Sequence, residues 1–81
     1  MGRDARYLLS DEAVEFKLLV SGRTFEARVT RQALEKRFGA SSDPESLIAA
    51  YRQNAPAIDS KAAEKIRAGQ QPPVQIDLQD L

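Results

Sequence analysis

Apolar and polar residues alternate along two neighbouring stretches of the chain, residues 14–20 and 24–29. A period of two is typical of β-strands with one buried face. The apolar residues that share this face are Val14, Phe16, Leu18, Val20, Phe25, Ala27 and Val29. Ser21-Gly22 lies between the stretches and favours a tight turn, so the pattern predicts a β-hairpin.

Opposite charges select the register of this hairpin. A two-residue loop at Ser21-Gly22 sets Lys17 opposite Glu26 and Glu15 opposite Arg28. A loop placed one residue later keeps apolar residues paired but sets Lys17 opposite Arg28. Directly opposed like charges destabilise a sheet, so we predict the first register.

Three helices are predicted after the hairpin, where the apolar spacing lengthens to about 3.6 residues. The first begins at the N-cap Thr30 and ends at Gly39, and the second begins at Asp43-Pro44. Pro56 ends or kinks the second helix near Asn54, and the sequence leaves open whether the second and third helices are continuous. Their inward stripes are Ala33, Leu34 and Phe38, then Leu47, Ile48 and Tyr51, then Ile58, Ala62 and Ile66. Gly69 closes the third helix.

The last segment alternates again and predicts a C-terminal strand. Its apolar positions are Val74, Ile76 and Leu78, and its polar positions are Gln75, Asp77 and Gln79. The predicted order is a β-hairpin, then two or three helices, then a strand. This order indicates a two-layer α+β fold with helices on one face of a mainly antiparallel sheet. Residues 1–81 are expected to form a single small domain.

Several segments together resemble a family of small bacterial proteins filed as a domain of unknown function. The segments are Val14-Glu-Phe, Val20-Ser-Gly, Val29-Thr-Arg-Gln-Ala-Leu-Glu, Ala50-Tyr-Arg-Gln-Asn, Ile58, Ala62 and Val74-Gln-Ile-Asp-Leu-Gln-Asp-Leu. The resemblance implies a small cytoplasmic α+β domain and no catalytic residues. This chain departs from the family's pattern at Ala55-Pro56, where that pattern carries an Arg after the Asn and no proline.

Composition removes several classes of chemistry. The 81 residues contain no Cys and no His, which excludes disulfides, thiol nucleophiles, Cys/His metal sites and a Ser-His-Asp arrangement. Twelve Lys and Arg balance twelve Asp and Glu, so no net charge draws the protein toward nucleic acid or anionic lipid. No signal peptide, membrane span or lipidation site is recognisable, so we expect a cytoplasmic protein without a membrane partner.

The remaining chemical candidates are weak. Asp11, Glu12 and Glu15 are the closest acidic cluster, but they lack the spacing and glycine of a calcium loop. A solvated start of the first hairpin strand, with Glu15 facing Arg28, explains them better. Ser60-Lys61 are adjacent on a helix and do not face each other. We therefore expect no catalytic residue, no metal and no cofactor.

A non-enzymatic protein-interaction or accessory module is the function that we predict, with an unknown protein partner or a second copy of the chain. In the chosen register Leu19 is the one large apolar residue on the outer face of the hairpin. We expect Leu19 to anchor the partner, with Glu15 and Arg28 in the polar rim. Isolated exposed leucines are also ordinary, and that reading stays open.

Weak nucleic-acid binding is the alternative function. Arg31, Arg37 and Arg52 lie in a central segment with a local excess of positive charge, and Tyr51 is a conceivable stacking platform. However, Tyr51 falls on the apolar stripe of the second helix and is better interpreted as a core residue. A mixed-charge surface is therefore the favoured interpretation.

Overall fold

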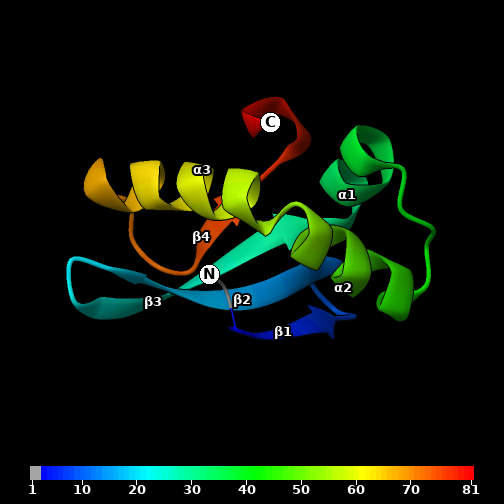
Figure 1. Ribbon diagram of the computed structural model, residues 1–81, viewed down its shortest axis with the longest axis horizontal. Coiled ribbons are helices and arrows are strands. Elements are labelled where there is room, and N and C mark those ends of the chain that lie inside the picture. The colour runs from blue at the N-terminus through cyan, green and yellow to red at the C-terminus, as the bar shows by residue number, and fades with distance from the viewer. Residues whose placement is uncertain (1–2) are drawn as a thin grey trace.

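The computed structural model describes residues 3–81, which form a four-stranded sheet with three α-helices on one of its faces (Figure 1). The elements in chain order are β1 (Arg3–Leu8), β2 (Ala13–Val20), β3 (Arg23–Thr30), α1 (Arg31–Phe38), α2 (Pro44–Gln53), α3 (Ala55–Arg67), β4 (Val74–Ile76) and the 3-10 turn η1 (Leu78–Asp80). The predicted α+β class is confirmed.

The hairpin and its register are confirmed. β2 and β3 pair antiparallel, with Glu15 opposite Arg28, Lys17 opposite Glu26 and Leu19 opposite Thr24. Ser21 and Gly22 form the connecting turn and both have positive φ angles, 53° and 80°. This backbone matches the twist of the flanking strands, which is why two-residue hairpins favour it.

One strand was missed by the sequence pattern. β1 pairs antiparallel with β2 and forms the edge of the sheet, whose order is β1-β2-β3-β4. Its register shifts between Arg3 and Arg6, where three residues of β1 span two of β2. Such a bulge interrupts the strict alternation that identifies a strand. The alternation of apolar and polar residues therefore did not identify β1 as a strand.

The C-terminal strand is shorter than predicted and runs parallel to its neighbour. β4 pairs in parallel with β3 at the other edge, so the sheet is mixed, with antiparallel pairs in the majority. Leu78 and Gln79 belong to η1 rather than to the strand. Asp77 and Asp80 close this turn by a reciprocal capping box, and Asp77 N donates to Asp80 Oδ2 at 2.8 Å. The capping box ends the strand, because it bends the backbone into a turn.

The helix boundaries follow the predicted capping residues. Thr30 and Asp43 accept hydrogen bonds from Ala33 N and Ser46 N at 3.1 and 3.0 Å. Gly39 ends α1 with a φ of 72°, in the left-handed region that glycine adopts readily. Asn54 separates α2 from α3, which resolves the question that Pro56 left open. The proline lies in the first turn of α3, where a backbone N–H has no helical partner to bond.

The core lies between the sheet and the helices, and Tyr51 is at its centre. This side chain is fully buried, and its ring stacks on Phe16 with centroids 4.4 Å apart and planes inclined by 24°. Tyr51 Oη donates to Asp59 Oδ1 at 2.8 Å. The interpretation of Tyr51 as a core residue is therefore confirmed.

A helix that spans a membrane must be both long and apolar. Within residues 3–81, no helix combines the length and the apolar character that crossing a bilayer requires.

Candidate functional site

The outer face of the sheet is the face opposite the helices, and no described element covers it (Figure 1). Strand alternation and the observed registers place the same set of pairs here that the sequence predicted. The described side chains that define this outer face are Arg6 and Leu8 of β1, Ala13, Glu15, Lys17 and Leu19 of β2, Thr24, Glu26 and Arg28 of β3, and Gln75 of β4.

A cluster of two arginines around one carboxylate, Arg6–Glu15–Arg28, spans three strands of this face. Arg6 donates to Glu15 Oε1 through Nε at 3.1 Å and Nη2 at 2.9 Å. Arg28 donates to Glu15 Oε2 through Nε and Nη2, both at 3.4 Å. Arg28 Nη1 also lies 3.7 Å from Asp11 Oδ2. Each arginine thus engages one oxygen of Glu15, and the cluster ties β1, β2 and β3 together.

Glu15 is buried although it lies on the uncovered face. Its side chain is only 7% exposed, whereas that of Arg28 is 26% exposed and that of Arg6 is 69% exposed. Burial raises the pKa of Glu15, but hydrogen bonds and positive charge, first from Arg6 and then from Arg28, outweigh it. The net result is a pKa below the ordinary value of 4.5, so Glu15 is ionised at neutral pH.

Leu19 lies further along the same strand, next to the hairpin turn. It is 70% exposed, and among the described residues Leu9 is the other large apolar side chain that is exposed. Lys17 and Glu26 lie between it and the arginine cluster, and both are exposed. A shallow depression of about 190 Å³ adjoins them, lined by Arg6, Glu15, Phe16, Lys17 and Glu26. The face therefore offers an apolar projection beside a polar hollow.

The structure brings the three predicted site residues onto one face, but in different environments. Leu19 is accessible and Arg28 partly so, whereas Glu15 lies beneath the arginines and orients them. Arg6 was missed, because it belongs to the unpredicted strand β1. Counting outward from a turn over residues 9–12 would have paired Arg6 with Glu15.

The acidic cluster considered as a metal site is engaged by arginines. Glu12 Oε1 lies 3.1 Å from Arg31 Nη2, and Asp11 and Glu15 face Arg28. In the described part of the chain, no group of three or more acidic side chains is gathered as a metal ion would require. These side chains form ion pairs that fasten the β1–β2 turn to β3 and α1.

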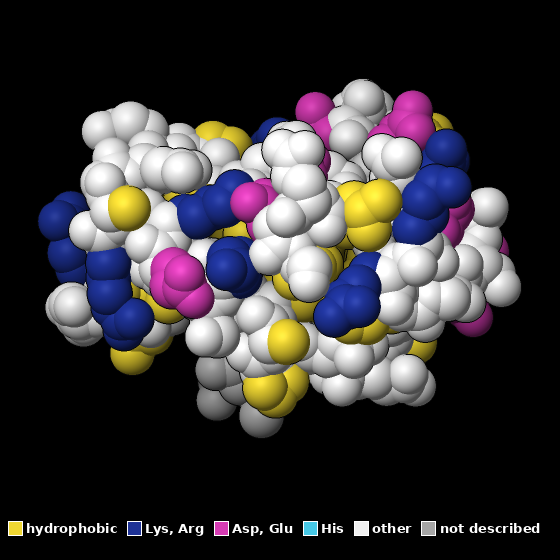
Figure 2. All heavy atoms as spheres, turned by 90° about the horizontal axis from the view of Figure 1, so that it is seen from above, with side chains coloured by type: hydrophobic (Ala, Val, Ile, Leu, Met, Phe, Trp, Pro, Cys, Tyr) yellow, Lys and Arg dark blue, Asp and Glu magenta, His cyan; other side chains and the backbone are white. Residues whose placement is uncertain are grey.

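Basic side chains on the helix side do not form one continuous patch. Figure 2 shows Lys and Arg side chains in separate groups, with acidic, apolar and neutral atoms between them. Lys61 and Lys65 are paired with Glu64 at 3.6 Å and Asp80 at 2.8 Å. Tyr51 is buried and unavailable for stacking on a base. The side of the molecule seen in Figure 2 thus presents a mixed-charge surface, and Tyr51 is not part of it.

The two carboxylates with lowered pKa values predict how stability depends on pH. The hydrogen bond from Lys65 lowers the pKa of Asp80 below its ordinary 3.8, despite burial, and Glu15 behaves likewise. A carboxyl group with a lower pKa in the folded state stabilises the fold above its unfolded pKa and loses this effect as pH falls through the folded pKa. We expect the free energy of unfolding to be steady from about pH 7 to 5 and to fall below about pH 4.

Urea titrations of the wild type and Glu15→Gln at several pH values check this expectation. The stability difference between the two proteins should be largest near neutrality and should shrink in acid, because protonation removes the same charge that the substitution removes. A difference that stays constant down to about pH 3 would show that ionised Glu15 does not stabilise the fold.

Comparison with known proteins adds one match. The sequence model of a family described as "Protein of unknown function (DUF1488)" matches residues 2–78. No curated protein and no solved structure matches the chain.

Proposed function

The chain belongs to the DUF1488 family of proteins of unknown function, and we propose that it is a non-enzymatic protein-interaction module that binds a partner protein through the outer face of its sheet. The exposed Leu19 carries the proposal, because the other apolar residues of that face, Leu8 and Ala13, are partly or fully buried. An apolar anchor surrounded by charged side chains is the arrangement in which a few residues supply most of an interface's binding energy.

The fold supports Leu19 as an anchor by holding its surroundings in place. Leu19 pairs with Thr24 of β3, and Leu18 and Val20 beside it are buried. The Arg6–Glu15–Arg28 cluster fixes the arginines on the same face. A prearranged surface loses little conformational entropy on binding. The partner surface that fits is an apolar pocket flanked by acidic groups that face Arg6 and Arg28.

Substitution of Leu19 separates a binding role from a folding role. We expect Leu19→Lys to change the free energy of unfolding by less than about 0.5 kcal/mol, because the side chain is exposed. Capture of partner proteins by a tagged bait in the native host should nevertheless drop, because a lysine cannot enter an apolar pocket without desolvation.

Leu9→Lys is the matched control for this experiment. Leu9 is 80% exposed, but it lies in the β1–β2 turn, away from Leu19. Proteins retained by the wild type and the Leu9→Lys bait but lost with Leu19→Lys support the proposal. Identical sets of proteins from all three baits would contradict the proposal. A large loss of stability in Leu19→Lys would show that the residue contributes to the core.

Nucleic-acid binding is the competing function, and it predicts a different measurement. With a formal net charge of zero, and with basic side chains in separate groups on the side seen in Figure 2, few phosphates can be neutralised together there. We expect binding to a generic DNA duplex at physiological salt to be weaker than about 100 μM in a fluorescence anisotropy titration. Low-micromolar binding that weakens steeply with added salt would favour the competing function instead.

A further inference from the structure

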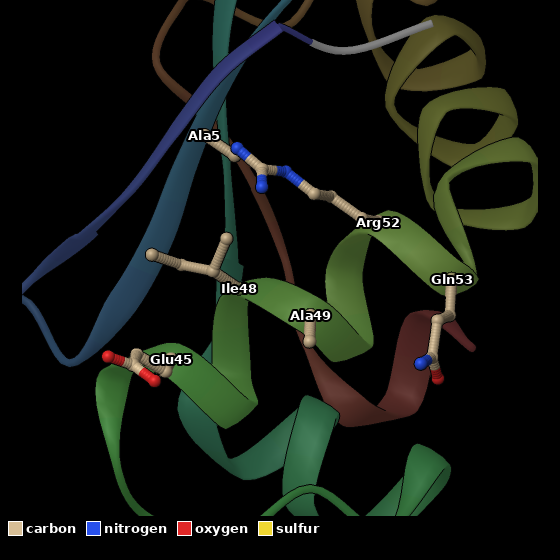
Figure 3. Close-up of a pocket in the computed structure, with 6 residues that line it drawn as sticks. All are labelled: Ala5, Glu45, Ile48, Ala49, Arg52 and Gln53. Carbon is tan, nitrogen blue, oxygen red and sulfur yellow. The ribbon is translucent and has the colours of Figure 1, made fainter.

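A second open surface lies at the β1 edge of the molecule, where a groove runs between β1 and α2. The groove has a volume of about 510 Å³ and is lined by Ala5, Glu45, Ile48, Ala49, Arg52 and Gln53. Its apolar middle is made by Ala5, Ile48 and Ala49. Figure 3 shows Ile48 pointing toward the strands and Arg52 reaching back toward Ala5, with Glu45 at the opposite end of the helix.

β1 offers backbone groups for pairing at this edge. Among the described residues it pairs only with β2, so its other side carries no strand partner. The bulge lies between Arg3 and Arg6, and the pairing from Arg6 to Leu8 is regular. Unpaired edge strands are the places where a further strand can be added to a sheet.

The two charged side chains at the ends of the groove restrict which partner can occupy it. Glu45 and Arg52 are both exposed, and within residues 3–81 neither side chain forms an ion pair or a hydrogen bond. They are seven residues apart, which is about two turns or 10 Å along one side of the helix. The midpoint between them falls between Ile48 and Ala49, the apolar centre of the groove.

A surface with opposite charges at equal distances from an apolar centre is complementary to itself. A twofold axis through that centre reverses the direction of α2, which sets Glu45 opposite the partner's Arg52 and Arg52 opposite the partner's Glu45. Ile48 and Ala49 then meet their own counterparts. No other single occupant satisfies both charges by symmetry.

We propose that a second copy of this chain occupies the groove, with the two β1 strands antiparallel and the sheet continued across the twofold axis. α2 contacts both β1 and β2. Joining the sheets at β1 therefore brings the two α2 helices beside each other on the same face of the continued sheet. The outer sheet face with Leu19 stays open in this dimer, so the inference goes beyond the proposed function.

Charge reversal tests the dimer by sedimentation velocity over a range of protein concentrations. The wild type should be dimeric, and Glu45→Arg and Arg52→Glu should each weaken association by about tenfold or more, because like charges then face each other across the axis. The double variant with both substitutions should regain most of the wild-type affinity, since the two ion pairs are restored with reversed polarity.

Glu64→Arg and Arg37→Glu are the matched controls, because both residues are exposed on helices outside the groove. They should leave the dimer unchanged. Ala49→Arg is a second test of the dimer, because it places a bulky charged side chain at the twofold axis without altering Glu45 or Arg52. This variant should be monomeric. Far-ultraviolet circular dichroism checks that each variant keeps its helices.

Three results would overturn the dimer. The first is a wild type that stays monomeric at about 100 μM, because a specific interface should associate well below that concentration. The second is single charge-reversal variants that dimerise as the wild type does. The third is a double variant that is folded but remains monomeric. A monomeric wild type that binds an added β-strand peptide would assign the groove to another occupant.

Discussion

Replacement of Tyr51 by alanine is expected to unfold the protein at 25 °C. The ring is fully buried, stacks on Phe16 and reaches Asp59 with its hydroxyl. Truncating a buried aromatic residue costs about 3 to 5 kcal/mol, because apolar burial is lost and a cavity remains. A single core in a chain of about 80 residues rarely supplies more than about 3 to 5 kcal/mol of net stability. Urea unfolding followed by circular dichroism measures the loss.

Tyr51→Phe is the control, because it keeps the ring and removes only the hydroxyl. We expect a folded protein that is less stable by about 1 kcal/mol, the usual contribution of one hydrogen bond. If Tyr51→Ala still unfolds cooperatively within a few degrees of the wild-type melting temperature, the sheet–helix core is not centred on this residue.

Glu15→Lys should be the most damaging single substitution on the outer sheet face. The carboxylate is buried between Arg6 and Arg28, so a lysine there brings a third positive charge into the cluster. Removing one partner of a buried ion pair costs about 3 to 5 kcal/mol, because the other charge stays uncompensated. Arg6 can turn into solvent and relieve part of this, so we expect a loss of about 3 kcal/mol in urea unfolding.

Glu26→Lys introduces the same charge change on the same face and serves as the control. Glu26 is exposed and lies opposite Lys17, so its reversal should cost less than about 1 kcal/mol. Equal losses for Glu15→Lys and Glu26→Lys would mean that the arginine cluster does not tie the strands together.

The sequence determines the hairpin and the helix ends because those features depend on neighbouring residues. The register follows from the charges of Lys17, Glu26 and Arg28 together with the turn at Ser21-Gly22. Thr30, Asp43 and Gly39 cap backbone groups within a few positions of themselves. Local hydrogen bonds and adjacent cross-strand pairs leave a signature that a single chain displays.

The missed features depend on contacts that sequence spacing does not encode. β1 contains a bulge, which disrupts its alternation, and its pairing is decided by β2. The end of β4 is set by the capping box of Asp77 and Asp80, although Leu78 continues the alternating pattern. In the candidate site, the outward position of Glu15 was predicted, but its hydrogen bonds from Arg6 on the unpredicted strand were not.

We propose that the outer sheet face around Leu19 contacts a partner protein. Its most direct test is site-specific photocrosslinking in the native host, with benzoylphenylalanine in place of Leu19, Leu9 or Glu64 in separate proteins. The control positions are exposed but lie in the β1–β2 turn and on α3. We expect illumination to give a covalent adduct with a protein other than a second copy of this chain at position 19, and little or no such adduct at positions 9 and 64. No adduct at position 19, or the same adducts at all three positions, would contradict the claim.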